Sequence, residues 1–137
     1  MKLAFRLRLA LSILVLVPLG IGTKFYVGPG AQWVQGHAGG LLYVVFWTTV
    51  VAVIVPTVSP WRAACGVFIV TCILELIQLW SPPVLQSVRQ TFFGHALLGS
   101  TFEWWDFLHY GLGAIGGAVL VGELARQPRT STSENLP

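Results

Sequence analysis

Residues 63–80 read AACGVFIVTCILELIQLW, an apolar run whose single charged residue is Glu75. Apart from Glu75 the chain stays uncharged up to residue 88, which exceeds the ~20 residues that a helix needs to cross a bilayer. A carboxylate inside such a helix costs roughly 2–3 kcal/mol or more on insertion scales. Gln78 lies one helical turn beyond Glu75 and shares its face. The pair predicts a membrane protein with polar groups built between its helices.

The composition points the same way. The 137-residue chain is 55% hydrophobic and 9% charged, whereas soluble domains average about 25% charged residues. A soluble protein with so little charge would expose large apolar patches, which lipid can cover. The formal charge of +3 comes mostly from the chain ends, and no basic stripe is interleaved with aromatic residues. We therefore expect an integral membrane protein with no nucleic-acid partner.

Four apolar runs predict transmembrane helices, at residues 7–23, 34–55, 61–80 and 104–124. Residues 84–103 are partly apolar but too short for a crossing, so they predict a re-entrant or interfacial segment between the third and fourth helices. The expected fold class is all-α, an integral membrane four-helix bundle. It forms one domain over residues 1–124, and a disordered cytoplasmic tail follows over residues 125–137.

The N-terminal run has a second interpretation. Residues 1–22 also follow the pattern of a signal peptide, with a basic start and a small-x-small ending at Gly20-Ile21-Gly22. Cleavage there would leave three spans. We expect the first helix to be retained, because Pro18 interrupts the apolar stretch and no soluble domain follows it.

The basic residues predict the orientation. With four spans, both ends of the chain lie on one side of the membrane. The positive-inside rule then places both ends in the cytoplasm and the other side at the outer leaflet. The cytoplasmic side would carry Lys2, Arg6, Arg8, Arg62, Arg126 and Arg129, against Lys24 and Arg89 on the other side.

Polar side chains lie near the end of the third predicted helix and at the start of the fourth, at a similar depth near the outer leaflet. The expected cluster contains Glu75, Gln78, Arg89, Asp106, His109 and Tyr110, with His95 as a further candidate. One interpretation is a structural network in which Arg89 bridges Glu75 and Asp106. The other is a site for a ligand head group or for proton transfer, because ionisable groups inside a membrane are functional candidates. Asp106 also has a local explanation, because an acidic side chain in the first turn of a helix is stabilised by the positive end of the helix dipole.

Metal and cofactor sites are not expected. The three histidines lack the HxxxH or HExxH spacing of a zinc site, and we expect His37 to be a hydrogen-bonded interfacial residue. Cys65 and Cys72 lie about 10 Å apart on one helix, too far for a disulfide. Residues 111–117 contain G-x-G-x-x-G without the strand that a dinucleotide site requires. Gly113 and Gly117 instead have the small-xxx-small spacing that would let the fourth helix pack closely on the third.

Several short motifs, taken in order, resemble a known family. They are Glu75-x-x-Gln78, Arg89, LGSTFEWWD at 98–106, Tyr110-x-x-Gly113 and GGLLYVVFW at 39–47. Their order and spacing resemble the domain of unknown function 2809 family, which implies a small multi-pass protein of the bacterial inner membrane with no assigned reaction. A weaker similarity is to VanZ-like proteins, through the Glu-x-x-Gln, the following Arg and the Asp before a glycine-containing helix. That similarity implies an outward-facing role at the envelope.

The sequence thus predicts an uncharacterised multi-pass membrane protein whose polar cluster binds a membrane lipid or an envelope-precursor head group. The alternatives are an enzyme acting on an envelope lipid and an accessory subunit of a transporter or envelope complex, with a second copy or another membrane protein as partner. No serine lies in a G-x-S-x-G elbow, so the sequence does not support nucleophilic catalysis. Enzymatic activity stays open, and the absence of a demonstrable activity is the favoured expectation.

Overall fold

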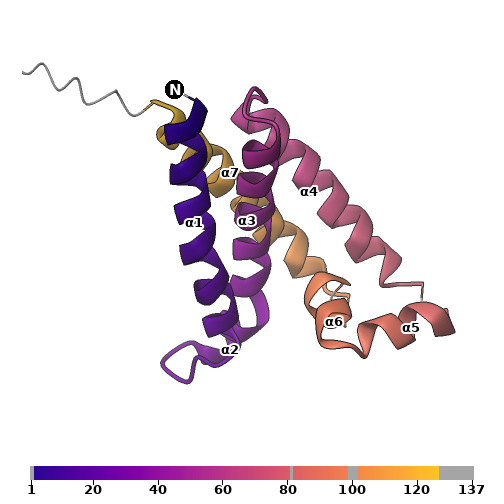
Figure 1. Ribbon diagram of the computed structural model, residues 1–137. Helices are drawn as coiled ribbons and strands as arrows, with labels where there is room; N and C mark the ends of the chain where they lie inside the picture. Colours follow the sequence, from indigo (N-terminus) through magenta and orange to yellow (C-terminus); the bar gives the residue numbers. More distant parts are fainter. Residues whose placement is uncertain (1, 81, 99–101, 127–137) are drawn as a thin grey trace, which may run out of the picture.

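The computed structural model describes residues 2–80, 82–98 and 102–126, and within these ranges it contains helices and no strand. The long helices are α1 (Lys2–Thr23), α3 (Gly39–Ile54), α4 (Pro60–Ile77) and α7 (Trp104–Arg126). Short elements connect them: α2 (Ala31–Trp33) and the π-helix η1 (Val34–Ala38) precede α3, and α5 (Pro83–Arg89) and α6 (Phe92–Leu98) precede α7. Figure 1 shows α5 and α6 at the end of the bundle opposite the N-terminus.

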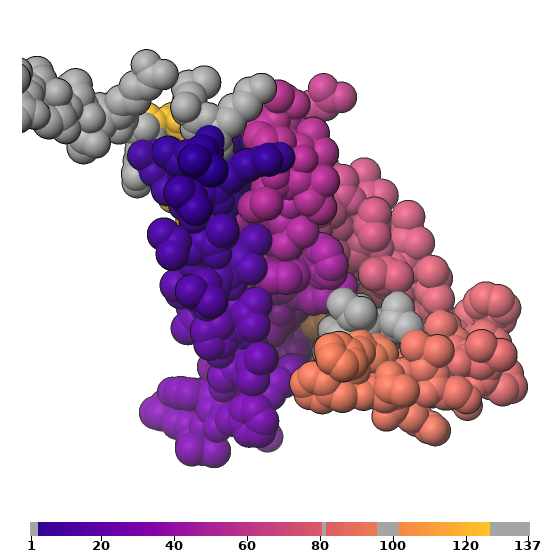
Figure 2. All heavy atoms as spheres, in the orientation of Figure 1, coloured from indigo at the N-terminus to yellow at the C-terminus, as the bar shows by residue number. Residues whose placement is uncertain are grey.

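Four helices are long and apolar enough to cross a membrane when α2, η1 and α3 are taken as one continuous helix. Their outward faces carry large exposed apolar side chains, among them Leu14, Ile69 and Ile115. In Figure 2, α1 and α4 form the two flanks of the bundle, and α5 projects from one end. The predicted all-α fold with four helices of spanning length is confirmed.

The helix boundaries differ from the predicted ones for local reasons. The first helix begins at Lys2 and not at residue 7, because residues 2–6 include lysine, leucine, alanine and arginine, which are good helix formers. The second begins at Ala31, directly after Gly30, whose φ of 72° is a left-handed conformation that favours glycine. The third ends at Ile77, and residues 78 and 79 continue as a turn.

The segment between α4 and α7 forms two helices of seven residues each. Each is about 10 Å long at 1.5 Å per residue, too short for a crossing. Helix α7 continues to Arg126, one residue past the predicted start of the tail at residue 125, and the guanidinium of Arg126 pairs with Glu123 at 3.1 Å. Residues 127–137 lie outside the described ranges.

Helix α3 is the centre of the bundle and contacts α1, α4 and α7. Gly113 and Gly117 face α3: a Cβ at Gly113 would lie 2.5 Å from the carbonyl oxygen of Leu41, and one at Gly117 would lie 2.9 Å from Cβ of Thr48. The expectation that these glycines pack on the third span was therefore wrong. The close partner is the second span, because α3 is the helix that occupies the middle of the bundle.

We predict that Gly113→Ala lowers the stability of the bundle by about 1–3 kcal/mol, because the new methyl group collides with backbone of α3. The matched control is Gly122→Ala on the same helix, where a Cβ has nothing within 4 Å. The control should be neutral or gain about 0.5–1 kcal/mol, since alanine favours a helix over glycine. Thermal unfolding in detergent micelles measures the difference, and equal melting temperatures would refute the close contact.

Candidate functional site

Glu75 is buried on α4 with 2% of its surface exposed, and three donors surround its carboxylate. The hydroxyl of Tyr110 donates to Oε2 at 2.8 Å, and Nε2 of Gln78 donates to the same oxygen at 3.0 Å. The backbone N–H of Glu103 donates to Oε1 at 3.2 Å. These four residues form the Glu75 cluster. Its hydrogen bonds compensate for burial of the carboxylate and tie α4 to α7 and to the chain that precedes α7.

Arg89 lies apart from both carboxylates that it was expected to bridge. It ends α5, and its Nη2 donates to the backbone carbonyl of Ile77 at 3.4 Å, at the C-terminal end of α4. Asp106 is contacted instead by Nδ1 of His37 at 3.1 Å, and Arg89 forms no ion pair with a described residue. The predicted Arg89 bridge is therefore not formed, because α5 places the guanidinium beneath the exposed carbonyls of α4, where a cation is favourable.

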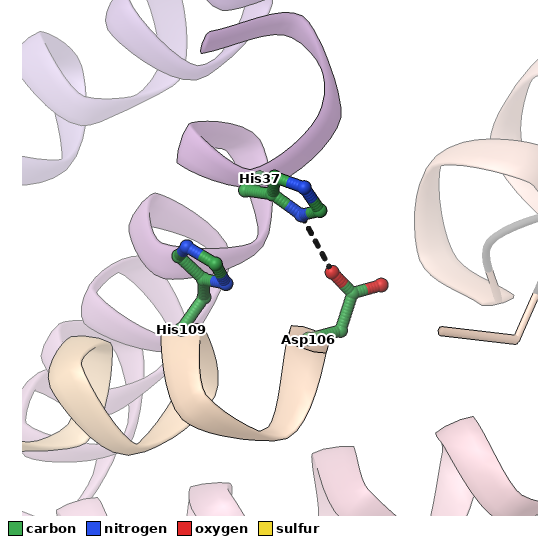
Figure 3. Close-up of side chains that lie close together, drawn as sticks. All are labelled: His37, Asp106 and His109. Carbon is green, nitrogen blue, oxygen red and sulfur yellow. Dashed lines mark hydrogen bonds and ion pairs between the residues drawn. The ribbon is translucent and has the colours of Figure 1, made fainter. Parts of the chain in front are cut away.

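Asp106 belongs to a second group, the His37 cluster, made of Trp33, His37, Asp106 and His109. Nδ1 of His37 donates to Oδ1 of Asp106 at 3.1 Å. The imidazoles of His37 and His109 are stacked, with centroids 4.6 Å apart and planes 6° from parallel. Figure 3 shows the two rings face to face, with the second oxygen of Asp106 directed away from both.

The hydrogen bonds of His109 fix its tautomer. Its Nδ1 lies 2.8 Å from the carbonyl oxygen of Trp105, which can only accept, so Nδ1 carries the proton. Its Nε2 then accepts a hydrogen bond from the indole Nε1–H of Trp33 at 3.2 Å. Both nitrogens of this buried imidazole are satisfied within the protein, so His109 holds Trp33 in place and is not poised to take a proton from a substrate.

The structure thus divides most of the predicted residues between two clusters and leaves Arg89 and His95 outside both. Tyr110 serves the Glu75 cluster and its neighbour His109 serves the His37 cluster, because successive residues of α7 point about 100° apart. His95 lies exposed on α6. Trp33 was not predicted as a site residue from the sequence, and His37 was predicted as an interfacial residue outside the cluster. The four-residue spacing of Trp33 and His37 was the available signal, since it places both on one helix face.

A cavity adjoins the His37 cluster. It has a volume of about 380 Å³ and is lined by Trp33, His37, Trp105, Leu108 and His109. Its walls are therefore two indoles, two imidazoles and one leucine. Trp105 is 68% exposed and Trp33 is 50% exposed, so both indoles also reach the outside of the bundle. The volume lies in the range of small-ligand sites, and the ring faces suit a cation more than an anion.

The donor atoms of His37, Asp106 and His109, one from each side chain, all lie within 4.8 Å of one another. Two imidazoles and a carboxylate form a ligand set that binds zinc and iron elsewhere. Here the rings are nearly parallel, and imidazole lone pairs lie in the ring plane, so the two rings do not aim at one point. A metal ion would also displace a hydrogen bond of His109. The expectation of no metal and no cofactor stays a prediction.

We predict that Tyr110→Phe lowers the free energy of unfolding by about 1.5–3 kcal/mol, because it removes a hydrogen bond to a buried carboxylate. Tyr26→Phe is the matched control, since Tyr26 is 39% exposed in the loop after α1. Chemical denaturation of both variants in micelles measures the effect. If the two variants lose the same stability, the hydrogen bond from Tyr110 to Glu75 contributes nothing.

We also predict that Zn²⁺ shows no saturable binding at micromolar concentration, because the stacked imidazoles do not converge on one ion. Isothermal titration of the purified protein with zinc chloride tests this. Saturable binding that disappears in His37→Ala, but persists in His95→Ala on the exposed face of α6, would contradict it.

The fold and the clusters define a class: a small all-helical protein with four helices long and apolar enough to cross a membrane, and polar groups gathered toward one end. A family model described as protein of unknown function (DUF2809) matches residues 30–114, and the chain belongs to this family. The matched residues contain both clusters. The predicted family resemblance is confirmed, whereas the similarity to VanZ-like proteins stays a prediction. Searches of curated proteins and of solved structures found no match.

Proposed function

We propose that the protein is a binding protein of the bacterial inner membrane that holds the ammonium-bearing head group of a lipid, or of a lipid-linked envelope precursor, in the aromatic cavity. The observation that carries this proposal is the cavity itself, framed by Trp33, Trp105 and two stacked imidazoles. Indole faces attract ammonium groups by about 0.5–2 kcal/mol each, depending on how far the cation is desolvated.

Charge near the cavity supports a cationic head group. The carboxylate of Asp106 touches the cavity-lining His37. Glu75 and Glu103 lie on the same side of the bundle, joined by the hydrogen bond within the Glu75 cluster. The negative potential of these carboxylates would therefore attract an ammonium group placed against the indoles and repel a free phosphate.

The surroundings of the cavity suit a lipid more than a water-soluble ligand. The cavity lies at the start of α7 and beside η1, the ends of two helices of spanning length. Tryptophan prefers the head-group level of a bilayer. The positive-inside count supports cytoplasmic chain ends, which would place this cavity at the outer leaflet. Binding is favoured over catalysis because both nitrogens of His109 are already engaged.

We predict that phosphatidylethanolamine copurifies with the protein and that Trp105→Ala reduces its occupancy about threefold to tenfold, through loss of one cation–π wall. Native mass spectrometry in micelles with equimolar phosphatidylethanolamine and phosphatidylglycerol measures the occupancy. Trp104→Ala is the matched control, because Trp104 is 74% exposed and is not among the residues that line the cavity. Asp106→Asn should also reduce the occupancy.

Two results would overturn the proposal. One is equal phosphatidylethanolamine occupancy in the two tryptophan variants. The other is an adduct lost in Trp105→Ala that proves to be phosphatidylglycerol, which has no ammonium group.

A further inference from the structure

A second cavity separates α3 from α4 toward the other end of the bundle. It has a volume of about 490 Å³, and Figure 1 shows the two helices diverging from the turn that joins them. Its walls are mainly apolar, with Tyr43, Trp47 and Val51 on α3 and Val67, Val70 and Leu74 on α4. A groove with mainly apolar walls at bilayer depth favours hydrocarbon over water, because few of its lining groups can hold a water molecule.

Arg62 lies at one end of this groove, and it is the sole charged residue among the described residues that line it. It follows Trp61, which is 55% exposed and marks an interfacial position. In the part of the chain that the structure describes, Arg62 has no hydrogen-bond or ion-pair partner. A guanidinium is a strong and directional partner for phosphate oxygens.

We propose that this groove binds one acyl chain of an anionic phospholipid, with the lipid phosphate on the guanidinium of Arg62. The lining on α4 runs from Arg62 to Leu74, about 18 Å at 1.5 Å per residue. That length is close to one leaflet of a hydrocarbon core about 30 Å thick. The groove therefore has the depth of a single acyl chain whose head group stays at the interface beside Trp61.

The positive charge at this end favours an anionic head group over a zwitterionic one. Arg62 opens α4 at the end of the bundle where α1 begins and α7 ends, which also carries Arg6, Arg8 and Arg126. Each arginine near a membrane surface attracts anionic lipid measurably. The inference does not depend on the aromatic cavity, which lies toward the opposite end of the bundle and takes a different head group.

Titration of the purified protein with phosphatidylglycerol, followed by native mass spectrometry, tests the proposal. We expect Arg62→Gln to weaken the affinity about fivefold, while Arg6→Gln, the same charge change on exposed α1, has less than about half that effect. Equal losses in the two arginine variants would overturn the role of Arg62.

The groove itself is tested by filling it. A Cβ at Gly66, which lines the groove, has nothing within 4 Å, so Gly66→Leu should fold and exclude the acyl chain. Gly122→Leu, equally uncrowded but on α7, is the control and should bind phosphatidylglycerol normally. Val70→Phe is a second filling variant, and unfolding scans verify each fold. If the folded filling variants still bind phosphatidylglycerol normally, the groove is not its binding site. This outcome does not depend on whether phosphatidylethanolamine binds at the aromatic cavity.

Discussion

The close approach of α7 to α3 is the contact on which the rest of the structure depends. Gly113 and Gly117 remove the side chains that would hold the two backbones apart. Lipid tails are as apolar as the helix surfaces, so the hydrophobic effect does not drive helices together within a membrane. Close van der Waals packing therefore supplies much of the attraction between them. One further turn along the same seam, Gly40 of α3 leaves room for the ring of Tyr110. The seam thus sets where Tyr110 stands, and Tyr110 in turn carries the bond to Glu75.

The same seam determines which polar groups meet. Since η1 continues directly into α3, His37 rests against the first turns of α7, where Asp106 and His109 lie. Glu75 approaches α7 from the other side, from α4. Helix α7 therefore separates two polar clusters that share neighbouring residues but no hydrogen bond among those described.

Much of the fold follows from the sequence by simple rules. Length and hydropathy predict the four long helices, and the spacing of Glu75 and Gln78 predicts their contact because neighbours on a helix need no tertiary information. The partner of Gly113 was predicted wrongly, since small-residue spacing marks a contact face without saying which helix meets it. The position of Arg89 depends on the direction of a connection made of two short helices. Hydrophobic periodicity in the sequence does not predict that direction. His37 and Asp106 are 69 residues apart, so only the folded chain brings them together.

The wide turn η1 has a consequence for how this protein can change. A π-turn closes with one more residue than an α-turn, so the chain before it is rotated relative to the helix after it. Trp33 lies before that turn, and the core-facing side of α3 lies after it. The turn therefore sets the direction in which Trp33 leaves the helix, and the hydrogen bond to His109 then holds its indole. Losing one residue within η1 would rotate Trp33 by about 100° around the helix axis relative to α3. The indole would then leave His109, so a single deletion changes the aromatic wall while the core-facing residues of α3 keep their register.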